Sequence, residues 1–76
     1  MKGGVAMATR ILEKDKQWYM DAVRAAVILN GFYAEDADRG ITDYKLRERL
    51  DMYPEEQFHE DTRDVADDIC RDYLSV

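Results

Sequence analysis

The side chains that most often carry out catalysis are scarce in this chain. It has one histidine (His59), one cysteine (Cys70) and one serine (Ser75), which stands next to the last residue. On a single helix the eleven positions between His59 and Cys70 correspond to about 16 Å along the axis, too far for a nucleophile and its base. The sequence therefore predicts a protein without catalysis, with His59 at the surface and Cys70 at the edge of the core.

The acidic runs match metal-binding motifs only in part. A calcium loop counted from Asp36 has Gly40 at its fifth position instead of its sixth, and Arg47 where the loop needs a bidentate glutamate. His59 and Glu60 resemble the start of a zinc-protease helix, but Arg63 occupies the place of the second histidine. We expect neither a metal site nor a cofactor.

Carboxylates instead gather near the end of the chain, in residues 55–72, which we call the acidic segment. It contains eight carboxylates and two arginines, and residues 50–76 together have a net charge of −7 against +1 for residues 1–49. On one helix, five of the carboxylates would follow each other at four-residue intervals, about 6 Å apart along the axis. This acidic row consists of Glu56, Glu60, Asp64, Asp68 and Asp72.

Like charges at this spacing cost about 0.2–0.5 kcal/mol per pair, so the row opposes helix formation. One interpretation is a contact surface for a protein partner with a basic surface. A second is a solvated face that keeps a small protein soluble. A third is mimicry of nucleic-acid phosphates. The protein would then be an inhibitor of the anti-restriction or anti-defence type, which blocks a nucleic-acid-binding protein.

Direct binding of nucleic acid, as by a helix-turn-helix regulator, is a further alternative. Lys45 and Arg49 share one side of an expected helix, but Asp43 and Glu48 interrupt them. The last helix, the usual recognition element, would repel phosphates. The sequence therefore disfavours direct nucleic-acid binding.

The first helix is expected to start at Thr9 or Asp15 and to end at Asn30, with Gly31 in the left-handed conformation behind it. Between residues 18 and 29 only Asp21 and Arg24 are charged, so most of the helix needs covering. A 76-residue chain has few elements for this purpose. The helix is therefore either central in a monomer, with Ile28 and Met20 partly exposed, or shared with a second copy in a homo-oligomer, and we favour the homo-oligomer. The residues predicted for that contact are Trp18, Tyr19, Val23, Val27 and Ile28.

The remaining chain predicts a loop over residues 32–40 and two more helices. Thr42 is the expected N-cap of a short second helix, with Ile41 stapled to Leu46, and Pro54 ends that helix near Met52. Leu46, Leu50 and Tyr53 form its expected buried edge. The acidic third helix begins at Pro54 or, alternatively, after an N-cap at Asp61. Its expected inward residues are Phe58, Thr62, Val65, Ala66, Ile69, Cys70 and Tyr73, followed by Leu74 and Val76.

The predicted fold is thus an all-α three-helix domain over residues 9–76, preceded by a flexible segment over residues 1–8. A lone cysteine fits a reducing compartment, and no apolar run has the length of a signal peptide or a membrane span. We expect a cytoplasmic protein that does not contact membranes.

The run AAVILNGFYAEDADRGITDYKLRERLD, together with the acidic tail, resembles small early-region proteins of lambdoid bacteriophages that are encoded between the exonuclease and excisionase genes. The resemblance lies in overall texture and carries no catalytic motif. It implies a small helical regulator in the bacterial host cytoplasm, which binds host or phage proteins and modulates phage development or host processes.

Overall fold

The computed structural model describes residues 11–75, and these residues form helices and short connections without a strand. The all-α class predicted from the sequence is confirmed, but the chain is divided into more helices than the three expected. The elements are α2 (Glu13–Leu29), α3 (Ala34–Tyr44), α4 (Leu46–Met52), α5 (Pro54–His59), α6 (Thr62–Ile69) and the π-helical turn η1 (Cys70–Leu74).

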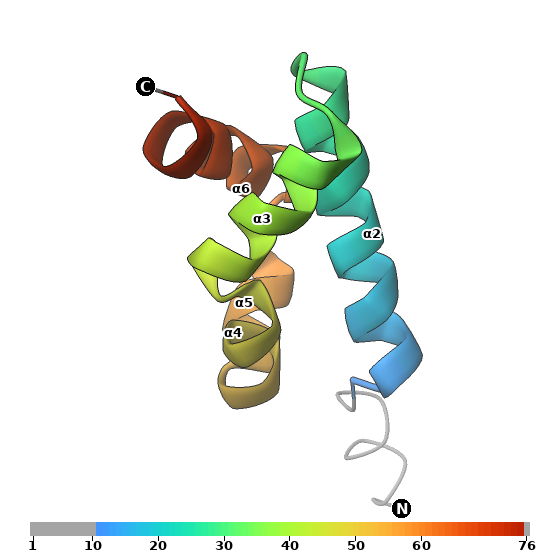
Figure 1. Ribbon diagram of the computed structural model, residues 1–76. Coiled ribbons are helices and arrows are strands. Elements are labelled where there is room, and N and C mark those ends of the chain that lie inside the picture. Colours follow the sequence, from blue (N-terminus) through green and yellow to red (C-terminus); the bar gives the residue numbers. More distant parts are fainter. Residues whose placement is uncertain (1–10, 76) are drawn as a thin grey trace, which may run out of the picture.

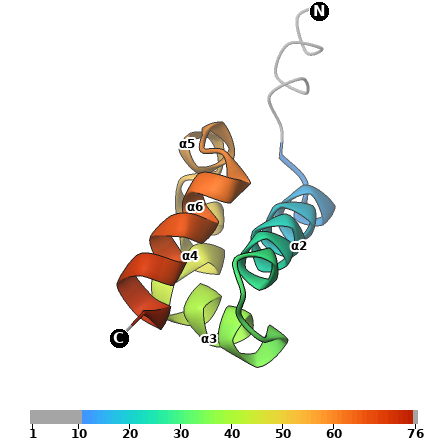
Figure 2. The same ribbon diagram turned by 90° about the horizontal axis from the view of Figure 1, so that it is seen from above.

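The long helix α2 forms one side of the molecule, and α4, α5 and α6 form the other, with α3 bridging the two sides (Figures 1 and 2). Helix α2 packs most extensively against α6 and also contacts α3 and α4. Exposed ion pairs join it to its neighbours: Lys16 lies 3.1 Å from Asp51 on α4, and Arg24 lies 2.8 Å from Asp38 on α3. None of the helices within residues 11–75 is long and apolar enough to cross a membrane.

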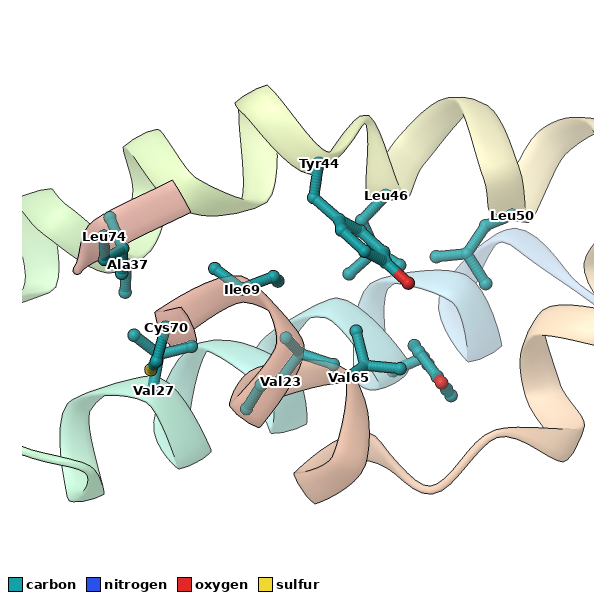
Figure 3. Packing of buried hydrophobic residues seen from close by; sticks show 12 residues of the cluster. Val23, Val27, Ala37, Tyr44, Leu46, Leu50, Val65, Ile69, Cys70 and Leu74 are labelled. Atoms are coloured by element: carbon teal, nitrogen blue, oxygen red, sulfur yellow. The ribbon is translucent and has the colours of Figure 1, made fainter. Parts of the chain in front are cut away.

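One apolar core lies between these two sides (Figure 3). Every helix except α5 contributes buried apolar side chains, and α5 contributes the partly buried Phe58. Figure 3 shows Val23 and Val27 of α2 facing Val65 and Cys70, while Ala37 and Leu74 meet near Ile69. The core residues are Tyr19, Val23, Val27, Ala37, Tyr44, Leu46, Leu50, Val65, Ala66, Ile69, Cys70 and Leu74.

Helix α2 ends as predicted. Its last helical residue is Leu29, Asn30 is the C-cap, and Gly31 has a φ of 105°, the left-handed conformation that glycine adopts at low cost. The helix begins at Glu13, and the alternative start at Thr9 lies outside the described residues. The segment over residues 1–8 likewise lies outside them.

The predicted loop over residues 32–40 is wrong, because α3 begins at Ala34 and runs through Gly40. Glycine disfavours a helix interior, but here it allows close packing. A Cβ added at Gly40 would lie only 2.6 Å from Cγ2 of Ile69 and 3.3 Å from both δ carbons of Leu74. Contact with α6 and η1 therefore outweighs the intrinsic preference of Gly40.

The predicted N-cap at Thr42 is also wrong, since Thr42 lies inside α3 and its hydroxyl donates to the carbonyl oxygen of Asp38. The break between α3 and α4 falls at Lys45, which has the left-handed values φ 62° and ψ 43°. Arg49 stabilises this break, because its Nε donates to the carbonyl oxygen of Tyr44 and its guanidinium lies 4.3 Å from the Tyr44 ring centre.

The end of α4 at Met52 and the start of α5 at Pro54 agree with the prediction. Leu46 and Leu50 are buried as expected, whereas Tyr53 is 55% exposed. The prediction that Tyr53 belongs to the buried edge is therefore wrong. It fails because Tyr53, with φ −133° and ψ 58°, is the junction between two helices and not part of a helical face.

The third predicted helix is two helices, so both of its proposed starting points occur. Helix α5 starts at Pro54, and α6 starts after Asp61, whose carboxylate accepts a hydrogen bond from the backbone N–H of Arg63 at 2.8 Å. The predicted inward face is confirmed for Val65, Ala66, Ile69, Cys70 and Leu74. Phe58 and Thr62 are half-buried. Tyr73, in the π-helical turn η1, is exposed, so its predicted inward position is wrong. Val76 lies outside the described residues.

Candidate functional site

The acidic row is distributed over several elements and does not lie on one helix, so its predicted geometry is wrong. Glu56 belongs to α5, Asp64 and Asp68 belong to α6, and Asp72 belongs to η1. Glu60 caps α5 with extended backbone angles, φ −83° and ψ 134°, which turn the chain between α5 and α6. The carboxylates therefore cover a bent surface, and only Asp64 and Asp68 lie four residues apart on the same α-helix.

Arginines partly neutralise the far end of the row. Arg71 lies 3.0 Å from both Asp68 and Asp72, and its hydrogen bonds lower the pKa of the Asp72 carboxyl. Arg63 lies 3.5 Å from Asp61. The other carboxylates of the acidic segment are exposed and form no ion pair with any residue of the range 11–75: Glu55, Glu56, Glu60, Asp64 and Asp67.

The bend between α5 and α6 is held against α2 by Tyr19. Its hydroxyl donates to the carbonyl oxygen of Glu60 at 2.7 Å and accepts a hydrogen bond from Nε2 of Gln57 at 3.3 Å. The Tyr19 ring packs on Phe58 with 5.1 Å between ring centres, and burial raises the pKa of its phenol. Gln57 is only 3% exposed, a buried polar residue that the sequence reasoning did not predict.

A surface hollow of about 230 Å³, which we call the bend hollow, lies at this bend. Trp18 precedes Tyr19 on α2, and its side chain is 64% exposed at the edge of the hollow. Aromatic rings thus meet carboxylates where α2 contacts the bend. The residues lining the bend hollow are Trp18, Tyr19, Phe58, Glu60, Asp61 and Thr62.

A larger groove of about 410 Å³, the tyrosine groove, lies where α3, α4 and η1 meet. Its aromatic wall includes Tyr44 and Tyr73, whose rings pack edge to face at 6.0 Å. Burial raises the pKa of the Tyr44 phenol, while the nearby Arg49 opposes that rise. The remaining lining residues are Asp43, Lys45, Glu48, Arg49, Met52 and Tyr53, so both signs of charge are present.

Residues with catalytic side chains are not brought together. His59 is exposed at the end of α5, and Cys70 is buried where α6 passes into η1, with its Sγ 3.6 Å from the amide Nδ2 of Asn30. The Ser75 hydroxyl donates to the carbonyl oxygen of Cys70. Within residues 11–75, no three His, Cys, Asp or Glu side chains are grouped closely enough to hold a metal ion.

The residues predicted for self-association divide into two groups. Tyr19, Val23 and Val27 lie in the core of a single chain, so their side chains are covered without a second copy. The sequence could not separate the two uses, because an apolar helix face looks the same whichever element covers it. Trp18 and Ile28 are exposed, and self-association through them stays a prediction.

The chain is a small all-helical domain, in the part described, with an acidic and aromatic surface at one bend. Comparisons with protein-family models, with curated proteins and with solved structures found no match to it.

Proposed function

We propose that this protein is a non-catalytic regulator that binds another protein through the acidic segment, and that the partner presents a basic surface. The observation that carries the proposal is a group of exposed carboxylates on both sides of the bend that form no ion pair with any residue in the range 11–75. They are Glu55, Glu56, Glu60 and Asp64. Electrostatic complementarity between such a surface and a basic partner speeds association and selects against wrong partners.

The fold also supports binding over simple solubility. Two basic residues inside the acidic segment are already engaged with neighbouring aspartates, so the remaining carboxylates keep their full charge for an external partner. Aromatic residues are enriched at protein interfaces, and the exposed Trp18 and the half-buried Phe58 line the bend hollow together with Glu60. A face that served only solvation would not need these rings.

The resemblance to early-region phage proteins gives this proposal its biological setting: a regulator in the cytoplasm of an infected bacterium, acting on a host or phage protein. Mimicry of a nucleic-acid strand is the less favoured form of the same idea. A phosphate strand continues smoothly, whereas the acidic row turns at Glu60 and is partly neutralised at Asp68 and Asp72.

The test is capture of partners from bacterial lysate with two variants of equal net charge. One carries Glu55→Gln, Glu56→Gln, Glu60→Gln and Asp64→Asn. The control removes four exposed carboxylates elsewhere that likewise have no ion pair in the described range, through Asp21→Asn, Glu35→Gln, Asp43→Asn and Glu48→Gln.

A partner retained by the wild type and by the control, but lost by the variant in the acidic segment, would support the proposal. Its affinity, measured with purified components, should fall steeply as salt increases. Equal retention by both variants would contradict a role for the acidic segment.

A further inference from the structure

The bend hollow combines two kinds of groups that recognise the same chemistry. Trp18 is 64% exposed, and the half-buried Phe58, whose ring packs on Tyr19, lines the hollow with it. Aromatic faces attract cations, and tryptophan does so most strongly. The hollow therefore offers an aromatic wall to a positive charge.

The same hollow is rimmed by two carboxylates. Glu60 forms no ion pair within residues 11–75. Asp61 uses its Oδ1 atom for both of its contacts with Arg63, at 2.8 Å to the backbone nitrogen and 3.5 Å to Nε. Its Oδ2 atom accepts no hydrogen bond within residues 11–75. A cation beside the rings would thus meet acceptors that are not already occupied.

We propose that the bend hollow binds the guanidinium group of an arginine side chain that the partner protein presents. This inference rests on the proposed function and names the anchoring group of that partner. The volume of about 230 Å³ is below the range of about 300–1,000 Å³ typical of small-molecule pockets, which fits a single side chain.

Arginine fits this arrangement better than lysine. A planar guanidinium stacks on an aromatic face and at the same time donates in its plane to carboxylates, whereas an ammonium group is a compact, strongly hydrated point charge. Arginine is also enriched among the residues that dominate binding energy at interfaces.

The tyrosine groove does not support an equally definite ligand. Its lining includes Asp43 and Glu48 as well as Lys45 and Arg49, so the groove favours neither a positively nor a negatively charged ligand. Arg49 is already stacked on Tyr44 and bonded to the Tyr44 carbonyl oxygen.

The experiment is a titration of the whole protein with N-acetyl-arginine amide, followed by NMR at the indole N–H of Trp18 and the backbone N–H of Thr62. We expect a saturable shift with a dissociation constant in the millimolar range. The citrulline derivative, which has nearly the same shape without the charge, should give no saturable shift, and the lysine derivative should bind several-fold more weakly.

Glu60→Gln and Trp18→Ala should each weaken arginine binding by about tenfold, the loss of one charged or one aromatic contact. Glu35→Gln is the matched control, because it makes the same change of side chain at an exposed position that lies outside both the hollow and the acidic segment, and it should change the affinity by less than about twofold. All three positions are exposed, and circular dichroism checks that the variants remain folded.

The proposal is overturned if arginine gives no saturable shift up to tens of millimolar, if citrulline binds equally well, or if Glu35→Gln weakens binding as much as Glu60→Gln. A dimer in sedimentation that Trp18→Ala dissociates would assign the hollow to a second copy of the chain instead. Loss of the protein partner on Trp18→Ala, measured separately, would extend the result from the probe to the partner.

The two proposals fail in different ways. If the acidic-segment variant loses the captured partner but arginine does not bind the hollow, the proposed function stands and the anchoring group is different. If arginine binds while neutralisation of the acidic segment leaves capture unchanged, the hollow is a cation site and the acidic segment is not the contact surface.

Discussion

The Tyr19 hydroxyl links α2 to the bend in the acidic segment, because it donates to the carbonyl oxygen of Glu60 and accepts from the Gln57 amide. Replacement by phenylalanine leaves the buried Gln57 amide and the partly buried Glu60 carbonyl without this bond, which costs about 1–3 kcal/mol. We expect Tyr19→Phe to lower the free energy of unfolding by about 2 kcal/mol in urea denaturation. Tyr33→Phe is the matched control, since Tyr33 is 78% exposed and should have almost no effect.

A change of less than about 0.5 kcal/mol for Tyr19→Phe would mean that solvent reaches the Glu60 carbonyl and that the bend is held by packing alone.

Gly40 gives a second prediction, in which helix propensity and packing oppose each other. Alanine is favoured over glycine inside a helix by about 1 kcal/mol, but its Cβ would lie 2.6 Å from Cγ2 of the buried Ile69. Overpacking of this kind costs about 1–3 kcal/mol. We therefore expect Gly40→Ala to destabilise the protein by about 1 kcal/mol in urea denaturation.

Ile69→Leu should partly rescue Gly40→Ala, because leucine carries no γ2 methyl and its branch point is one bond further from the backbone. The two substitutions should then be non-additive in a double-mutant cycle. Additive losses would show that Ile69 is not the group that resists the added Cβ.

Individual residues also show where prediction from the sequence was limited. Periodicity found the buried positions of α2 and α6, including Val23, Val27 and Ile69, since spacing of three and four residues is enough for that purpose. It could not find the break at Lys45, because a left-handed lysine has no local signal. That break depends on Arg49, whose contacts with Tyr44 exist only in the folded chain.

At the scale of the elements, the start of α6 depends on Asp61. The Arg63 backbone N–H, and then its side chain, lower the pKa of this carboxyl below its ordinary value. A carboxyl with a lowered pKa in the folded state stabilises the protein at pH values above its unfolded pKa of about 3.9, and this contribution disappears as the pH falls through the folded value.

The comparison of wild type with Asp61→Asn isolates this effect, because asparagine also caps helices but cannot ionise. At pH 7 we expect the wild type to unfold at a higher temperature than the variant, by a few degrees. The difference should vanish as the pH falls through the folded-state pKa of Asp61, where its carboxyl becomes protonated. Thermal scans of both proteins between pH 2 and 7 measure it, and a difference independent of pH would contradict the assigned role of the charge.

The sequence offered two alternative starts for the acidic helix and could not show that the acidic segment forms two helices, α5 and α6. Pro54 and Asp61 each mark a helix start, and both signals are used. What the spacing could not show is that the chain bends at Glu60, because that turn is held by a tyrosine 41 positions away. The bend hollow follows from the same long-range contact and was therefore not predictable from local pattern. Two of its lining residues were predicted from the sequence to be functional, but in separate roles: Glu60 in the acidic row and Trp18 in self-association.

At the scale of the whole molecule, charge repulsion and ion pairing act in opposite directions. The chain has seventeen acidic and eleven basic side chains, and the acidic segment concentrates eight of the carboxylates. The ion pairs described above lie at the surface, where each contributes about 0–1 kcal/mol. Repulsion among unpaired carboxylates is spread over many pairs, so we expect it to outweigh the attraction lost when salt screens the ion pairs.

The melting temperature should therefore rise by several degrees between about 10 mM and 500 mM sodium chloride, over which the screening length falls from about 30 Å to below 10 Å. The variant Glu55→Gln, Glu56→Gln, Glu60→Gln, Asp64→Asn should show a smaller rise and a higher melting temperature at low salt, because its acidic segment carries four fewer charges. Sucrose at equal osmolarity controls for effects on solvation. A melting temperature that falls with added salt would show that the ion pairs dominate, and that the acidic segment costs the fold little.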